Sequence, residues 1–179
     1  MISFEQAYEI MMRNAFPVGY ERVSFDQALH RMLGEEVRAD RDMPPFHKSA
    51  VDGYACIDPA PGQQLEVLEH VAAGKQPERI LTTGTCSKVM TGAEVPENAT
   101  HVVMVEQVEE LGANKIKLAE PGNKSNIAIR AEDFREGDPV IPKGTWLQPQ
   151  HIAILAAVGH IRPLVAEYPS VKLITTGSE

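Results

Sequence analysis

The sequence predicts an α+β protein in which a helical domain is interrupted by an inserted β-rich, barrel-like domain. Residues 1–38 carry apolar side chains at helical spacing, and residues 139–170 return to that spacing. Between them, residues 39–138 hold short β-rich runs separated by turn signals. The last segment, 171–179, is an apolar run followed by a turn, and we expect it to open a further α/β domain.

Two helices are predicted at the start of the chain. Ser3 and Gln6 form a capping box, and apolar residues recur at helical spacing until Pro17 ends the helix. The same capping pattern recurs at Ser24, and a second apolar stripe leads to Gly34, the expected C-cap of a second helix.

The middle of the chain, residues 39–138, has a different residue pattern. Here β-branched residues and turn dipeptides replace the apolar residues at helical spacing. Evenly spaced short strands of this kind are typical of a compact barrel or sandwich. The expected strands are Tyr54–Ile57, Leu65–Ala72, Ser87–Met90, His101–Val108, Lys115–Ala119 and Ile127–Ile129.

The end of the sequence predicts one more helix and two strands. Pro149 suits the first position of a helix, and Gly159 suits the position just after its end. Strands are expected at Ile161–Ala166 and at Val171–Thr175, the second covered on both faces. The turn that follows, ending at Glu179, has the signature of a helix start. We therefore expect this chain to be the front portion of a larger protein.

Composition excludes several classes of protein. The formal net charge is −8, whereas a general nucleic-acid or acidic-membrane binder needs a basic face. No apolar run is long enough to span a bilayer, and the start has no signal-peptide pattern, so we expect a cytoplasmic protein. Cys56 and Cys86 have no CxxC spacing and are expected to be buried thiols in a reducing compartment.

Four small-residue turns carry an acid or a hydroxyl. Taken singly, each is also compatible with an ordinary turn: Asp-Gly favours a positive φ, Thr-Gly can simply end a strand, and adjacent acids are often a solvated loop. The motifs are PPFHKSAVDGYA with Asp52, MTGAEVP with Thr91, RAEDFREGD with Asp133, and TTGSE with Glu179.

These four motifs, taken together and in this order along the chain, resemble those of the MoeA family. This family, the molybdopterin molybdenumtransferases, includes the E-domain of gephyrin. The resemblance covers the whole chain and rests on PPFHKSAVDGYA, VMTGAEVPENATHVVMVEQ, NIAIRAEDFREGDPVIPKGTWLQPQHIAILAAVG and VKLITTGSE. It implies an enzyme of molybdenum cofactor biosynthesis that inserts molybdenum from molybdate into adenylylated molybdopterin and releases AMP, assisted by Mg²⁺.

The resemblance also implies an architecture: an elongated homodimer in which the β-rich domain of one subunit faces the pterin-binding domain of the other. Residues 1–38 and 139–170 would form the helical domain, 39–138 the inserted β-rich domain, and 171–179 the start of the pterin-binding domain. The first helix, within residues 1–19, would pack on the rest of that last domain. Its apolar residues would then be partly uncovered in this chain: Phe4, Tyr8 and Met11.

Site residues are carried over by motif position. The expected catalytic residues are Asp52, Thr91, Asp133 and Glu179. The three acids would supply hard oxygen ligands to Mg²⁺. The expected substrate contacts are Ser49, Gly53, Thr91, Gly92 and Arg130. Thr91 and the N–H groups beside Gly92 are expected to bind an oxyanion such as molybdate or phosphate.

The sequence departs from the family pattern at several of these motifs. His47 and Lys48 replace Asp-Asn, while Val51 replaces Met. The other departures replace two arginines, a glycine and an aspartate of the pattern: Ala128, Ile129, Ala131 and Ser178. An alternative is therefore a gephyrin-type scaffold or assembly module without ligand turnover, and tungsten in place of molybdenum is a third possibility. This chain alone, lacking most of the pterin-binding domain, is expected to be inactive.

Overall fold

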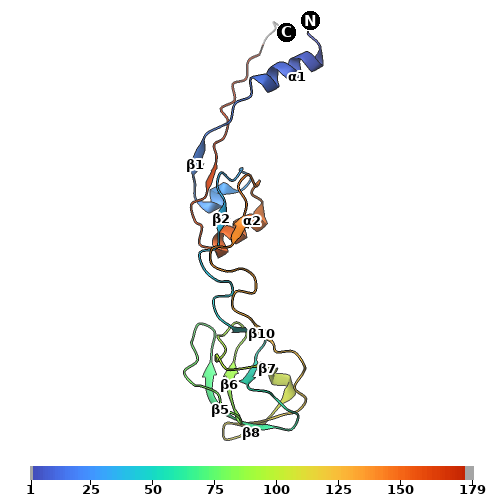
Figure 1. Ribbon diagram of the computed structural model, residues 1–179, viewed down its shortest axis with the longest axis vertical. Coiled ribbons are helices and arrows are strands. Elements are labelled where there is room, and N and C mark those ends of the chain that lie inside the picture. The colour runs from blue at the N-terminus through green and yellow to red at the C-terminus, as the bar shows by residue number, and fades with distance from the viewer. Residues whose placement is uncertain (1, 176–179) are drawn as a thin grey trace. The chain divides into compact units, whose positions relative to one another are not determined.

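The computed structural model describes residues 2–175, which fall into two units (Figure 1). One unit combines Met1–Asp40 with Pro139–Glu179, and the other is Arg41–Asp138. None of the helices in the described part of the chain has the length and apolar character that a membrane crossing requires.

The two-segment unit contains few helices. Its elements are α1 (Phe4–Arg13), β1 (Tyr20–Arg22), the 3-10 helix η1 (Phe25–Ala28), β2 (Val37–Arg38), β11 (Pro139–Ile141), α2 (Pro149–Ala157) and β12 (Leu164–Ala166). Its strands pair antiparallel across the two segments of sequence, β1 with β12 and β2 with β11. The expected helical domain is thus a mixed unit, in which short strand pairs join the two chain segments.

The central unit is predominantly β. Its elements are β3 (Lys48–Ser49), β4 (Gly53–Cys56), β5 (Gln64–Val71), β6 (Thr85–Val89), β7 (His101–Met104), the 3-10 helix η2 (Val105–Gln107), β8 (Val108–Gly112), β9 (Lys115–Leu118) and β10 (Ile127–Ala128). Six strands form one sheet in the order β7-β4-β6-β5-β9-β8, and β3 pairs separately with β10. Within this sheet only β5 and β6 pair in parallel.

Both faces of the central sheet are buried in apolar cores. Along β4, Tyr54 and Cys56 belong to one cluster while Ala55 belongs to the other, as the alternation of side chains along a strand requires. The first cluster is Tyr54, Cys56, Leu65, Val67, Cys86, Val103, Ile116 and Leu118. The second is Ala55, Val71, Leu81, Val89, Ala93, Val95 and Val102.

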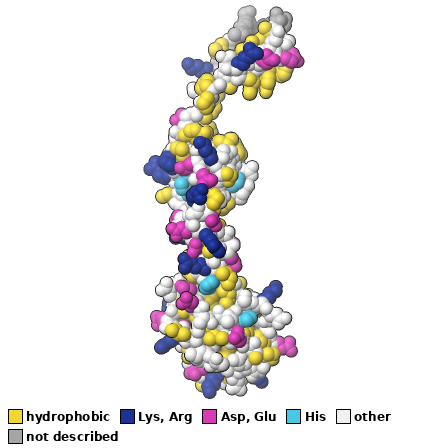
Figure 2. All heavy atoms as spheres, viewed as in Figure 1, with side chains coloured by type: hydrophobic (Ala, Val, Ile, Leu, Met, Phe, Trp, Pro, Cys, Tyr) yellow, Lys and Arg dark blue, Asp and Glu magenta, His cyan; other side chains and the backbone are white. Residues whose placement is uncertain are grey.

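Three of the predicted helix boundaries are confirmed. The Ser3 hydroxyl accepts from the Gln6 N–H and the Gln6 side chain accepts from the Ser3 N–H, so the capping box is formed. Pro149 is the first residue of α2, and Gly159 has the positive φ expected just after its end. Figure 2 shows apolar side chains on the surface of α1, where Phe4 is 77% exposed.

The second predicted helix is wrong. Only the 3-10 helix η1 forms, and the Ser24 side chain makes no capping hydrogen bond. The chain instead pairs with a distant segment: His30 N–H donates to Leu147 O and Leu33 N–H to Thr145 O. Gly34 ends no helix; a Cβ there would lie 2.4 Å from the Tyr20 ring. Tertiary pairing overrides local helix propensity here.

Two strand predictions are also corrected. The run expected as one strand over His101–Val108 is broken by η2, so β7 and β8 lie on opposite edges of the sheet. The run Val171–Thr175 is not in a strand, and Leu173 is 90% exposed, against our expectation of a strand covered on both faces. A buried strand needs neighbours on both sides, and the described residues provide none there.

Candidate functional site

Two of the predicted site residues, Asp52 and Thr91, are hydrogen-bonded to each other in the central unit. Asp52 Oδ1 accepts from both Thr91 N–H and Thr91 Oγ1, each at 2.7 Å. These two hydrogen bonds, that from the hydroxyl first, lower the pKa of Asp52 although the residue is exposed. A carboxylate that stays ionised and has one oxygen beyond this pair suits a cation or a polar ligand.

Strand pairing in the sheet places Asp52 and Thr91 side by side. Asp52 immediately precedes β4 and Thr91 follows closely after β6, and Gly53 is the register partner of Val89 in this antiparallel pair. Gly53 lacks the positive φ that the alternative interpretation, an ordinary Asp-Gly turn, would give it. Glycine is needed there because a Cβ would lie 2.3 Å from the Val103 carbonyl oxygen. The Asp-Gly dipeptide thus marks a close strand contact.

The loop after β6 is fixed by its own backbone. Gly92 has a φ of 80°, its N–H donates to Ser49 O at 2.8 Å, and the Ala93 N–H donates to Met90 O at 2.9 Å. With the Thr91 N–H on Asp52, all three N–H groups are already bonded. An oxyanion held by these groups stays a prediction, and its binding would have to displace these hydrogen bonds.

Ser49 is hydrogen-bonded through both its hydroxyl and its backbone. The residue is buried, and its side chain donates to Val51 O and accepts from the Val51 N–H. Its N–H donates to Ala93 O, while its carbonyl accepts from Gly92. Ser49 therefore holds the Thr91 loop in place, and a direct substrate contact by its hydroxyl stays a prediction.

Arg130 follows β10, which pairs with one side of β3, whereas Glu94 of the loop after β6 pairs with the other side. The Arg130 Nε donates to Asp42 Oδ2 at 2.7 Å, and its N–H donates to His47 Nδ1 at 3.1 Å. The Glu136 N–H and then the Arg130 guanidinium lower the pKa of Asp42. The Arg130 side chain is still 61% exposed, so it can also face a ligand.

Asp133 sits in a turn whose backbone is bonded to Met43. Its N–H donates to Met43 O at 3.0 Å, and its side chain is exposed. The turn begins at Ala131, which has a φ of 60°, a conformation that favours glycine. Ala131 stands where the family pattern has glycine, and its positive φ is a conformation that glycine adopts without strain.

Two further departures, Lys48 and Ala128, are direct neighbours. They are register partners in the β3–β10 pair, and Lys48 also forms a bridge with Glu94 on its other side. Directly opposed residues present their side chains on the same face. A cation at Lys48 therefore lies across from the position at which the family pattern has an arginine.

His47 and Arg130 also line a hollow of about 630 Å³ in the central unit. Its lining is of mixed charge and includes Arg79, Glu94 and Glu97, while neither Asp52 nor Thr91 belongs to it. Sequence reasoning gave no sign of this hollow, because its lining comes from four separate stretches of chain.

The described residues do not bring three metal-ligating side chains together. No group of three or more His, Cys, Asp or Glu arranged to hold a metal occurs in residues 2–175. Two exposed carboxylates, Asp52 and Asp133, remain, and Mg²⁺ commonly takes only one or two protein carboxylates plus phosphate oxygens and water. Carboxylate oxygens are ligands that Mg²⁺ accepts, and a metal-binding role for Asp52 and Asp133 stays a prediction. The predicted ligand Glu179, and Ser178 before it, lie outside the described residues.

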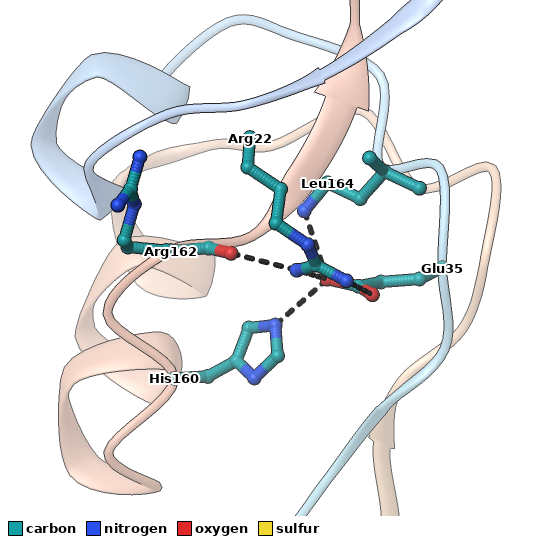
Figure 3. Close-up of polar contacts among 5 residues, drawn as sticks. All are labelled: Arg22, Glu35, His160, Arg162 and Leu164. Atoms are coloured by element: carbon teal, nitrogen blue, oxygen red, sulfur yellow. Dashed lines mark hydrogen bonds and ion pairs between the residues drawn. The ribbon is translucent and has the colours of Figure 1, made fainter.

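A second polar cluster, which sequence reasoning missed, surrounds Glu35 in the two-segment unit (Figure 3). Glu35 Oε1 accepts from Arg22, from His160 Nε2 at 2.9 Å and from the Leu164 N–H at 2.8 Å, and Oε2 accepts from Arg22 at 2.8 Å. Burial alone would raise the pKa of Glu35, but these donors lower it to about 2. Both carboxylate oxygens are thus bonded to groups of the chain, and the cluster joins residues 22, 35, 160 and 164.

Comparisons with known proteins agree with the motifs. The family described as MoeA N-terminal region (domain I and II) matches residues 2–159. A molybdopterin molybdenumtransferase of Staphylococcus aureus strain Mu50 is 36% identical over 165 residues, which are 88% of this chain and 39% of that protein. One from Staphylococcus epidermidis strain RP62A is 32% identical over 185 residues, covering 99% and 44%.

Solved structures show the same relationship. The molybdopterin biosynthesis moeA protein from Pyrococcus horikoshii OT3 superposes with a TM-score of 0.80 at 33% identity, over 93% of this chain and 46% of that one. The present chain thus spans less than half the length of these relatives. It has a MoeA-like fold with a mostly β half-barrel sheet and few helices, and it belongs to the MoeA family as the N-terminal region of that family.

Proposed function

We propose that the protein to which this chain belongs inserts molybdenum from molybdate into adenylylated molybdopterin and releases AMP. Membership of the family supports the proposal, because the relatives above carry the name of that transferase. The observation that carries it is the Asp52–Thr91 pair, an ionised and exposed carboxylate held by two hydrogen bonds. The relatives' names favour this enzyme over a scaffold.

In this proposal Asp52 and Asp133 are the groups of this chain that would hold Mg²⁺, together with Glu179 from the start of the next domain. The ion would neutralise charge on the phosphate of the leaving AMP. Thr91 keeps Asp52 ionised and oriented, so that its second oxygen faces the ligand. Arg130 would contact an anionic group of the pterin substrate, and Lys48 would add positive charge on the opposite strand.

The same proposal places the complete reaction in a longer protein. We infer a homodimer in which this β-rich unit completes the pterin site of a second subunit. The chain of 179 residues alone is then expected to release no AMP. Measurable release by this chain would contradict the division of the site between two parts.

The test of Asp52 uses a protein of the relatives' length that carries this chain as its front portion. Asp52→Asn keeps the hydrogen bonds from Thr91 but removes the charge, so AMP release should fall by at least about tenfold. Glu109→Gln, an exposed acid on β8 away from the pair, is the matched control and should keep the unmodified rate. An Asp52→Asn protein with the unmodified rate would refute the role of Asp52.

Binding of Mg²⁺ can be tested separately on the present chain. Adding magnesium chloride should shift the carboxyl carbon resonances of Asp52 and Asp133 in NMR spectra, and Asp52→Asn should abolish the shift at residue 52. If the ion moves neither resonance, these two carboxylates alone are not the metal site.

A further inference from the structure

The two cysteines of this chain, which are distant in the sequence, are direct neighbours in the central sheet. Cys56 on β4 is the register partner of Cys86 on β6 in an antiparallel pair. Both are free thiols, both are fully buried, and both belong to the same apolar cluster. The sequence suggested two unrelated buried residues, because the strand register is invisible in the spacing.

This placement suits a disulfide. Directly opposed residues of antiparallel strands have Cα atoms about 4.5–5.5 Å apart, within the roughly 4.4–6.8 Å that disulfides span. Both side chains belong to one core cluster and therefore lie on the same face of the sheet, next to each other. The two thiols also interact electrically, since Cys56 contributes to the raised pKa of Cys86.

We propose that Cys56 and Cys86 form a reversible cross-strand disulfide when a peroxide reaches the core of the central unit. One thiolate attacks a peroxide oxygen, giving a sulfenic acid and water, and the second thiolate displaces water from the sulfenic sulfur to form the S–S bond. The two sulfurs lose two electrons to the peroxide, and the two thiol protons leave in water. A thiol reductant reverses the change.

The rate of this reaction is set by opening of the sheet. Burial raises the pKa of both thiols to about 12, so the reactive thiolate is scarce in the closed state. Local opening of strands exposes such groups transiently. Mild urea, below the unfolding transition, should therefore accelerate oxidation.

The disulfide would clamp the strand pair that carries the candidate site. Asp52 and Thr91 flank one end of the β4–β6 pair, next to the partners Gly53 and Val89, and the cysteines lie three register steps further along, roughly 10 Å away. The proposal rests on strand register alone and is independent of the proposed function.

The experiment treats the folded chain with hydrogen peroxide, alkylates the remaining thiols under denaturing conditions, and maps the peptides by mass spectrometry. We expect one intramolecular crosslink between the peptides of Cys56 and Cys86, which dithiothreitol removes. The oxidised chain should unfold at a temperature at least about 5 °C higher, because the crosslink restricts the unfolded state.

Two controls make the result specific. Cys86→Ala removes one partner and should give no intramolecular crosslink. Ala55→Cys combined with Cys56→Ala keeps two thiols but moves one to the opposite face of β4, where Ala55 packs in the other core cluster, and it too should not crosslink. Free thiols, higher oxidation states or intermolecular bonds alone in the unmodified chain after treatment would overturn the proposal.

Discussion

Glu35 in the two-segment unit and Asp52 in the central unit are both carboxylates with a lowered pKa, yet their surroundings differ. Glu35 has both oxygens bonded, and its partners come from chain segments more than 100 residues apart. Asp52 is exposed and uses one oxygen, bonded to a single residue.

The difference separates a structural carboxylate from one that can act on a ligand. A mostly buried charge whose donors are all protein groups stabilises the fold, and losing one partner leaves costly unpaired groups. An exposed carboxylate with an unused oxygen contributes little to stability but remains available. A lowered pKa alone therefore does not identify a functional acid. The more informative property is whether a carboxylate oxygen is left without a hydrogen bond to the protein, so that it can bind a ligand.

The largest effect expected from this comparison is loss of stability on changing Glu35. Glu35→Gln keeps the shape but removes the charge that Arg22 pairs with, and should reduce the free energy of unfolding by about 2 to 3 kcal/mol, measured by urea denaturation. The value lies below that of a fully buried pair because Arg22 is half exposed. Glu9→Gln, in an exposed pair with Arg13, should cost less than about 0.5 kcal/mol. Equal losses in the two variants would break the comparison.

The same carboxylate predicts a pH dependence. The pKa of Glu35 falls from its ordinary 4.5 to about 2 in the folded chain, so the unfolded chain takes up this proton first. Its contribution is therefore complete above about pH 5 and is lost as the pH falls toward 2. Between those values the unmodified chain should lose about 2 kcal/mol more than the Glu35→Gln variant. Parallel pH profiles would show that Glu35 is not the titrating group.

A smaller gain in stability is expected at the turn that carries Asp133. Ala131→Gly relieves the positive φ and should raise the free energy of unfolding by about 0.5 to 1 kcal/mol. Ala128→Gly in β10, where the backbone is extended, is the matched control and should lower it by a similar amount. A loss at both positions would mean that the Ala131 conformation carries no strain.

The smallest effect on stability is expected at the candidate site itself. Thr91→Val removes the hydroxyl donor to Asp52 but leaves the backbone donor, so the thermal unfolding midpoint should change less than in any variant above. The pKa of Asp52 should move back up toward its ordinary value, which an NMR titration of its carboxyl carbon can follow. A large drop in the midpoint would place Asp52 with Glu35 as a structural group.

Local patterns predicted what depends on neighbouring residues. The Ser3 capping box, the proline start of α2 and most strand positions follow from backbone preferences that act over a few residues. The motif order indicated the family, and Asp52 and Thr91 were both named from their motifs. The caps, the strands and each motif are defined by residues close together in the sequence, and so the sequence alone indicated them.

Tertiary structure decided everything that depends on register or long-range pairing. The segment after Ser24 is barely helical because it pairs with residues 145–147, and Gly53 is required by a carbonyl on a neighbouring strand. The adjacency of Cys56 and Cys86, and the four donors around Glu35, likewise arise from segments that meet only on folding. The sequence indicated which residues could carry chemistry, whereas strand register determined which of them meet, because hydrogen-bonded pairing joins residues regardless of their separation along the chain.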